Sequence, residues 1–137
     1  MSAKGRSTLN RKEVEFVNRI PFCKFATTGK DGSPHVTPLW MIYEDGRFVM
    51  TTRETTVKVR NVRRDPRVAV LVDEGTLYVM AKGRARVAND RDTAKDTEKL
   101  AIKALGEEAG PKRAKEIMKI KHVSIEVMPE RVVSSNL

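Results

Sequence analysis

Three tight-turn signals divide the chain into short apolar runs, and they constrain the fold more than any other feature. They are GKDG at 29–32, Glu44-Asp45-Gly46, and DEGT at 73–76. Glycine next to another turn former, between β-branched and apolar runs, is typical of a β-hairpin. Six strands are expected, at 22–28, 35–43, 47–52, 67–73, 77–88 and 122–128. Because hairpins join strands antiparallel, the sequence predicts a mainly β (α+β) protein: a six-stranded antiparallel barrel with flanking helices.

Helix signals and prolines mark the ends and edges of this sheet. An Asn-x-x-Glu capping-box pattern predicts a helix over 10–19. Pro38 removes one ladder donor from strand 35–43, which is therefore expected at a sheet edge or a bulge. A short helix is expected to begin at Thr55 or Thr56 and to run to Arg64, before an Asp-Pro pair. Two further helices, separated by a Gly-Pro break, are expected at 90–110 and 111–121.

Length and composition fit one cytoplasmic domain over 1–137, with residues 1–7 disordered. No apolar run approaches the roughly 18–20 residues of a membrane span, so no membrane partner is expected. The first residues lack the apolar region of a signal peptide. Cys23 is the only cysteine, which excludes an internal disulfide and predicts a buried, inert thiol.

Basic residues are concentrated in one segment. The chain has 27 Lys and Arg against 18 Asp and Glu, a net charge of +9, and such a surplus favours anionic ligands. Six basic residues accompany two acidic ones over 53–67, whereas nine accompany seven over 90–121. The first segment is interpreted as a site and the second as a solvated helix surface. Few aromatic residues and no recognition-helix motif are present, so no nucleic-acid partner is expected.

The segment 50–73 has the features of a phosphate site. A strand ends in Thr51 and Thr52 and a helix begins soon after, so free backbone N–H groups and the positive end of the helix dipole meet there. Lys58 lies in the first turn of that helix, and Asn61 follows on the same face. A capped surface helix with a solvated basic face is the other interpretation. The residues alone leave both open.

The same segment resembles a known family. KVRNVRRDPRV at 58–68, with the valine-rich strand after it, is similar to the pyridoxamine 5'-phosphate oxidase-like superfamily of flavin-binding split barrels. ATTGKDGSPHVTPLWMIYEDGRFVMTT at 26–52, KGRARV at 82–87 and VMPERV at 127–132 resemble strands of that family. The resemblance extends over residues 10–133 and so takes in nearly the whole chain.

This resemblance implies a flavin-type cofactor at the interface of a homodimer. FMN is the first expectation, and the deazaflavin coenzyme F-420 and FAD are the alternatives. By position, Thr52, Thr56 and Lys58 match the phosphate-holding residues of the family, with Thr51 as a close neighbour.

A second group of site residues follows from the same resemblance. The strand that matches the one beside the flavin ring consists of Val36, Thr37, Pro38, Leu39 and Trp40. Lys82 or Arg84 of the partner subunit is expected to complete the site.

Two departures separate this chain from the vitamin-B6 enzyme itself. Val57-Lys58 stands where that enzyme has an Arg-Lys pair, and the tail SSNL lacks its substrate-binding Arg. The pattern is closer to a branch that includes F-420 users along with FMN, FAD and haem binders. We therefore expect a flavin- or deazaflavin-dependent oxidoreductase that transfers a hydride to or from a small organic substrate. No side chain is assigned as catalytic, because hydride chemistry belongs to the cofactor. The alternatives are a protein that binds or carries FMN without turnover and a basic nucleic-acid-binding domain.

Three further residues are ambiguous. His35 is either a substrate contact or a polar strand residue with its hydrogen bonds satisfied, and Trp40 either stacks near the cofactor or packs in the core. His35 and His122 are the only histidines, and neither has a carboxylate or cysteine at ligand spacing, so no metal site is expected.

Overall fold

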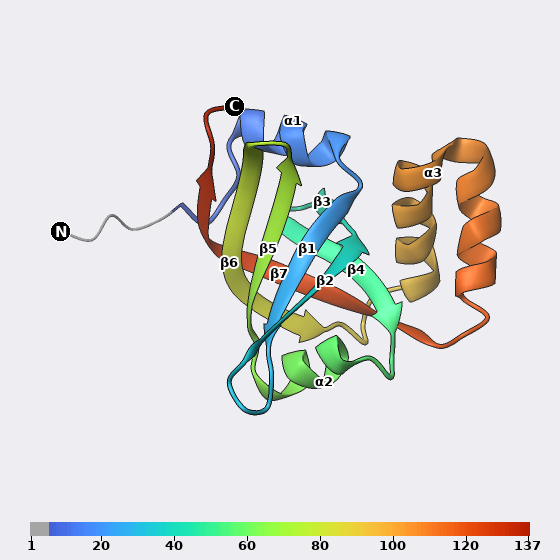
Figure 1. Cartoon of the computed structure of the whole chain (residues 1–137). Helices are drawn as coiled ribbons and strands as arrows, with labels where there is room; N and C mark the ends of the chain where they lie inside the picture. Colours follow the sequence, from blue (N-terminus) through green and yellow to red (C-terminus); the bar gives the residue numbers. More distant parts are fainter. Residues whose placement is uncertain (1–5) are drawn as a thin grey trace.

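The computed structural model describes residues 6–137, which form a curved antiparallel half-barrel with three helices against it (Figure 1). The helices are α1 (Arg11–Arg19), α2 (Val57–Arg64) and α3 (Thr93–Ile117). The strands are β1 (Phe22–Thr28), β2 (Pro34–Trp40), β3 (Ile42–Glu44), β4 (Arg47–Arg53), β5 (Arg67–Glu74), β6 (Leu77–Val87) and β7 (His122–Ser134). Their order in the sheet is β2-β1-β5-β6-β7-β4-β3.

The prediction of six strands is wrong by one, because the expected strand 35–43 divides at Met41. This side chain is fully buried, and its backbone N–H donates to the carbonyl of Pro21 at 3.0 Å. On either side the chain pairs with different partners: β2 pairs with β1, and β3 pairs with β4. The segment therefore joins the two outer strands of the sheet.

Prolines occupy the positions that a sheet tolerates. Pro38 lies in β2, which pairs only with β1 among the described strands, so the expected edge position is confirmed. Strand β7 is longer than predicted because it continues through Pro129. The register between β6 and β7 shifts between Lys82 and Gly83, opposite that proline. A bulge of this kind accommodates the missing N–H donor.

The capping box of α1 is confirmed. Asn10 Oδ1 accepts the Glu13 N–H at 2.9 Å, and Glu13 Oε1 accepts the Asn10 N–H at 2.8 Å. Residues 1–5 of the stretch predicted to be disordered lie outside the described residues. At Arg6 the structure differs from that expectation, because the guanidinium pairs with buried Glu13 at 2.7 Å and the backbone bridges to Val132. This ion pair lowers the pKa of Glu13 to about 2.

The predicted break between two helices lies at Gly106, not at the Gly110-Pro111 pair. Gly106 has φ 95° and ψ 173° inside α3, and the two halves fold against each other as a helical hairpin (Figure 1). Gly110 instead permits the close approach of these halves, since a Cβ there would lie 2.6 Å from Ile102 Cα. Gly110 therefore allows the two halves to pack closely, and the positive φ at Gly106 allows the chain to turn between them.

The core lies between the concave face of the sheet and the helices. Its largest fully buried side chains include Phe25, Phe48, Met50 and Ile125. Cys23 is buried as predicted, and burial raises the pKa of its thiol to about 12. No helix within residues 6–137 is long and apolar enough to cross a membrane.

Candidate functional site

Lys58 is a buried cation in the first turn of α2. Only 8% of its surface is exposed, and burial lowers the pKa of its ammonium because desolvation disfavours the charged form. No carboxylate or hydrogen-bond acceptor of residues 6–137 offsets that effect. Arg60 and Arg63 on the same helix are exposed, so Lys58 is not part of a solvated basic face. Its Nζ has no hydrogen-bond partner within residues 6–137 and is not fully enclosed, so the side chain is buried while its charged end reaches the surface. This position favours an anion supplied from outside the chain.

The N-terminus of α2 offers donors to the same anion. Thr56 is the N-cap residue, but its hydroxyl donates to the Arg53 carbonyl at 3.0 Å and caps no helical N–H. The first turn contains no acidic side chain. The free N–H groups and the positive end of the helix dipole are therefore available, as at many phosphate sites.

The two threonines at the end of β4 point to opposite faces of the sheet, since neighbouring strand residues alternate. Thr52 is buried. Thr51 lines a pocket beside α3, and its Oγ1 accepts a hydrogen bond from the Thr97 hydroxyl at 3.1 Å. These residues were predicted as neighbours at one phosphate, whereas the pleat of β4 directs them to different surroundings.

Strand β2 carries two buried polar atoms without partners. Thr37 Oγ1 and His35 Nδ1 are both inaccessible and accept or donate no hydrogen bond within the described chain. The two residues lie on one face of the strand, opposite Phe25 and Thr27 of β1. The expectation that a structural His35 would have its hydrogen bonds satisfied is not met at Nδ1. Buried polar atoms of this kind usually have a partner, and these two lie opposite buried residues of β1.

Asn61 fixes α2 on the sheet. Its side-chain amide donates to Thr27 Oγ1 at 3.0 Å, and its Oδ1 accepts from the Arg64 guanidinium at 2.8 Å. The Arg60 guanidinium donates to the Thr55 carbonyl at 2.9 Å. Both side chains thus hold the helix in place, and the role of Asn61 as a cofactor contact stays a prediction.

The remaining predicted residues are spread over the β2 edge and a separate surface. Val36 is 57% exposed on the outer face of β2, whereas Pro38, Leu39 and Trp40 line the pocket beside α3. Lys82 is exposed on β6 and lines another hollow with residues of β1 and β5. Its place in the partner's site stays a prediction.

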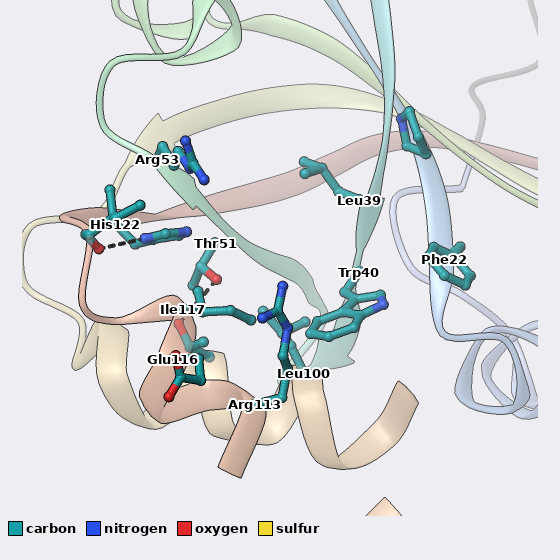
Figure 2. A pocket seen from close by; sticks show the side chains of 13 residues that line it. Phe22, Leu39, Trp40, Thr51, Arg53, Leu100, Arg113, Glu116, Ile117 and His122 are labelled. Atoms are coloured by element: carbon teal, nitrogen blue, oxygen red, sulfur yellow. Dashed lines mark hydrogen bonds between the residues drawn. The ribbon is translucent and has the colours of Figure 1, made fainter. Parts of the chain in front are cut away.

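A pocket with a volume of about 510 Å³ lies between strands β2 and β4 and the α3 hairpin (Figure 2). It is lined by Phe22, Pro38, Leu39, Trp40, Thr51, Arg53, Thr97, Leu100, Arg113, Glu116, Ile117, Ile120 and His122. Trp40 is therefore a pocket wall and only partly buried, not a core residue.

Sequence reasoning missed the contribution of α3 to this pocket. Residues 90–121 were interpreted as a solvated surface because their charges balance, yet Leu100, Arg113 and Ile117 face the pocket (Figure 2). Their spacing in the sequence gives no signal, since Leu100 and Ile117 come together only when the chain reverses at Gly106. His122 also lines the pocket, and its Nδ1 lies 2.7 Å from the Ile120 carbonyl. No group of three metal-ligating side chains gathers within residues 6–137.

Together these features fit a planar, phosphorylated ligand. Lys58 and the N-terminus of α2 provide charge and donors for a phosphate, and β2 provides free backbone groups along its outer edge. An apolar wall adjoins the end of that edge at Leu39 and Trp40.

A comparison with known proteins identifies the class to which this half-barrel and its phosphate-type site belong. A family profile described as pyridoxamine 5'-phosphate oxidase matches residues 9–136. The chain belongs to this family, within the pyridoxamine 5'-phosphate oxidase-like split-barrel superfamily, and the resemblance seen in the sequence is confirmed.

Solved structures show the same fold. A conserved hypothetical protein of Mycobacterium tuberculosis, Rv2991, is 25% identical, with a TM-score of 0.80 over 99% of this chain and 89% of that chain. An F-420 reductase is 22% identical, with a TM-score of 0.72 over 91% and 98% of the two chains. The heme storage protein HutZ from Vibrio cholerae is 14% identical, with a TM-score of 0.69 over 92% and 94%.

Proposed function

We propose that this protein is an oxidoreductase that binds FMN or the deazaflavin coenzyme F-420 and transfers a hydride to or from a small organic substrate. Lys58 carries the proposal, as a lysine whose side chain is buried and whose ammonium has no carboxylate partner within residues 6–137. Family membership and the structural similarity to an F-420 reductase support the choice of cofactor class.

The residues have distinct tasks in this proposal. Lys58 and the free N–H groups at the start of α2 bind the cofactor phosphate, with Thr52 and Thr56 close by in the chain. Strand β2 orients the ring through the free backbone groups of its outer edge, since it pairs only with β1 among the described strands. The bound cofactor supplies the hydride chemistry. Asn61 contributes by holding α2 against β1 through Thr27.

A second copy of the chain is part of the proposal. Phe22 is 54% exposed and Val36 57% exposed on the β1–β2 side of the sheet, where an edge strand has free hydrogen-bonding groups. Covering this edge with a partner would bury both side chains and enclose the ring. Lys82 or Arg84 of that partner would then approach the site. Sedimentation should return twice the chain mass of 15.4 kDa, whereas a monomer that binds cofactor tightly would contradict this assembly.

The test is a titration of FMN and of coenzyme F-420 into the parent protein, Lys58→Met and Lys95→Met. Methionine keeps the length and apolar stem of Lys58 but removes the charge. A charge-assisted bond to phosphate is worth about 1.5–3 kcal/mol, so Lys58→Met should weaken binding by about ten- to a hundredfold. Lys95 is an exposed lysine of α3, and Lys95→Met should bind like the parent. Equal affinities for the parent and Lys58→Met would remove the site assignment.

A further inference from the structure

The pocket beside α3 has an apolar body and a cationic rim. Leu39, Trp40, Leu100 and Ile117 form walls that come from both the sheet and the helical hairpin (Figure 2). Its volume of about 510 Å³ lies within the range of small-molecule sites, about 300–1,000 Å³. Arg113 extends from the second half of α3 toward Trp40, and Arg53 lies at the end of β4 (Figure 2).

Neither arginine is neutralised by the chain. Two acidic residues lie close to them in sequence, and both pair with lysines: Glu116, which also lines the pocket, with Lys119 at 3.0 Å, and Glu54 with Lys121 at 3.5 Å. No ion pair to Arg53 or Arg113 forms within residues 6–137, whereas most other arginines of the strands, such as Arg47 and Arg86, bind carboxylates. Two free guanidinium groups above an apolar floor favour an anion with an apolar body.

We infer that this pocket binds an organic anion, a molecule with an apolar body and one carboxylate or phosphate group, as the substrate of the proposed oxidoreductase. Arg113 is the main residue that binds the anionic group, and Arg53 makes a smaller contribution. The assignment of this pocket as the substrate site rests on the proposed function. Leu39 and Trp40 belong both to the pocket wall and to the strand proposed to orient the cofactor ring. The cofactor phosphate has separate residues, Lys58 and the start of α2.

Trp40 makes the inference directly measurable. It is the only tryptophan of the chain and lines the pocket, so its fluorescence reports on occupancy. Cofactor-free protein is titrated with 3-phenylpropionate, with neutral 3-phenylpropionamide and with phenyl phosphate. 3-Phenylpropionate should bind at least about tenfold more tightly than 3-phenylpropionamide. Tighter binding of phenyl phosphate would identify a phosphate monoester, and tighter binding of 3-phenylpropionate a carboxylate.

Matched variants identify the groups responsible. Arg113→Gln should weaken binding of the better anion by about tenfold, and Arg53→Gln by less. Lys112→Gln removes a neighbouring exposed charge that does not line the pocket and should have no effect. Both arginines are exposed, so these variants should fold, which circular dichroism checks. Equal affinities for the acid and the amide, or for the parent and Arg113→Gln, would overturn the inference.

The same variants separate this inference from the proposed function. Lys58→Met should retain anion binding, and Arg113→Gln should retain FMN binding. Anion binding at the pocket in a protein that binds neither FMN nor coenzyme F-420 would reject the proposed function and keep the pocket. If Arg113→Gln weakened cofactor binding as much as anion binding, the arginine would belong to the cofactor site and the inference would fall.

Discussion

Lys58 on α2 and Lys103 on α3 both lie largely out of solvent, but the fold treats them differently. Burial lowers the pKa of both ammonium groups, that of Lys103 to about 8. Lys103 Nζ donates to the Val17 carbonyl at 2.8 Å and to the Met41 carbonyl at 3.0 Å. Lys58 has no such acceptor within residues 6–137. The comparison shows that the partners of a buried lysine, more than its burial, distinguish a structural cation from a binding one.

The position of Lys103 explains what its bonds achieve. Val17 belongs to α1, and Met41 is the residue at which the chain passes from β2 to β3. Lys103 therefore fastens the first half of α3 to two elements that are distant in the sequence. That half carries Leu100 and Thr97, which line the pocket. A structural lysine thus holds one wall of the pocket in place.

Lys103→Met should lower the free energy of unfolding by about 1 kcal/mol. The Met41 carbonyl would lose the ammonium donor and the Val17 carbonyl would keep only the Ile20 N–H at 3.3 Å, at about 1–3 kcal/mol for each lost bond. The lowering of the Lys103 pKa from 10.5 to about 8 means that removing the charge regains at most about 3 kcal/mol. Urea unfolding at pH 7 measures the difference. An unchanged urea midpoint would show that the hydrogen bonds of the Lys103 ammonium make no net contribution to stability.

The pH dependence of stability should identify Lys103 more specifically. Its folded pKa of about 8 lies below the ordinary value of 10.5, so the unfolded state binds more protons between these values and stability rises with pH. Cys23 acts in the opposite direction, since burial raises the pKa of its thiol from 9.0 to about 12 and the unfolded chain loses that proton first. The two effects predict a rise of about 1 kcal/mol from pH 7 to pH 9, followed by a plateau to about pH 10.5.

Two variants test that curve. The stability of Lys103→Met should not rise between pH 7 and pH 9, and it should fall above pH 9, because only the Cys23 contribution remains. The free energy of unfolding of Cys23→Ala should continue to rise up to about pH 10.5. Urea titrations at several pH values give these slopes, with Lys112→Met as the exposed control. A parent curve that is flat from pH 7 to pH 9 would contradict the shifted titration of Lys103.

Much of the fold could be predicted from local signals, whereas the partners of side chains could not. The turns at Gly32, Gly46 and Gly75 all have positive φ, and each was visible as a glycine beside Asp or Glu. The break at Met41 was not, because the apolar run continues through it. Gly106 follows Leu105 inside a helical pattern, whereas an Asp or Glu directly precedes each of the three hairpin glycines. Lys58 was found through its place in the first turn, but its lack of a partner depends on elements far away in sequence.

Lys58→Met should stabilise the cofactor-free protein, by about 0.5–1 kcal/mol. The native ammonium is partly desolvated and has no carboxylate or carbonyl partner within residues 6–137, and an apolar side chain of similar length avoids that penalty. The same substitution removes a cation from the proposed phosphate site, so stability and cofactor affinity should change in opposite directions. Thermal unfolding without ligand and with saturating FMN measures both: the variant should melt higher than the parent without ligand and lower with it. Lys95→Met, which removes an exposed charge from α3, should match the parent in both conditions. If Lys58→Met melted below the parent without ligand, Lys58 would have a structural role like that of Lys103, and the contrast between the two lysines would be wrong.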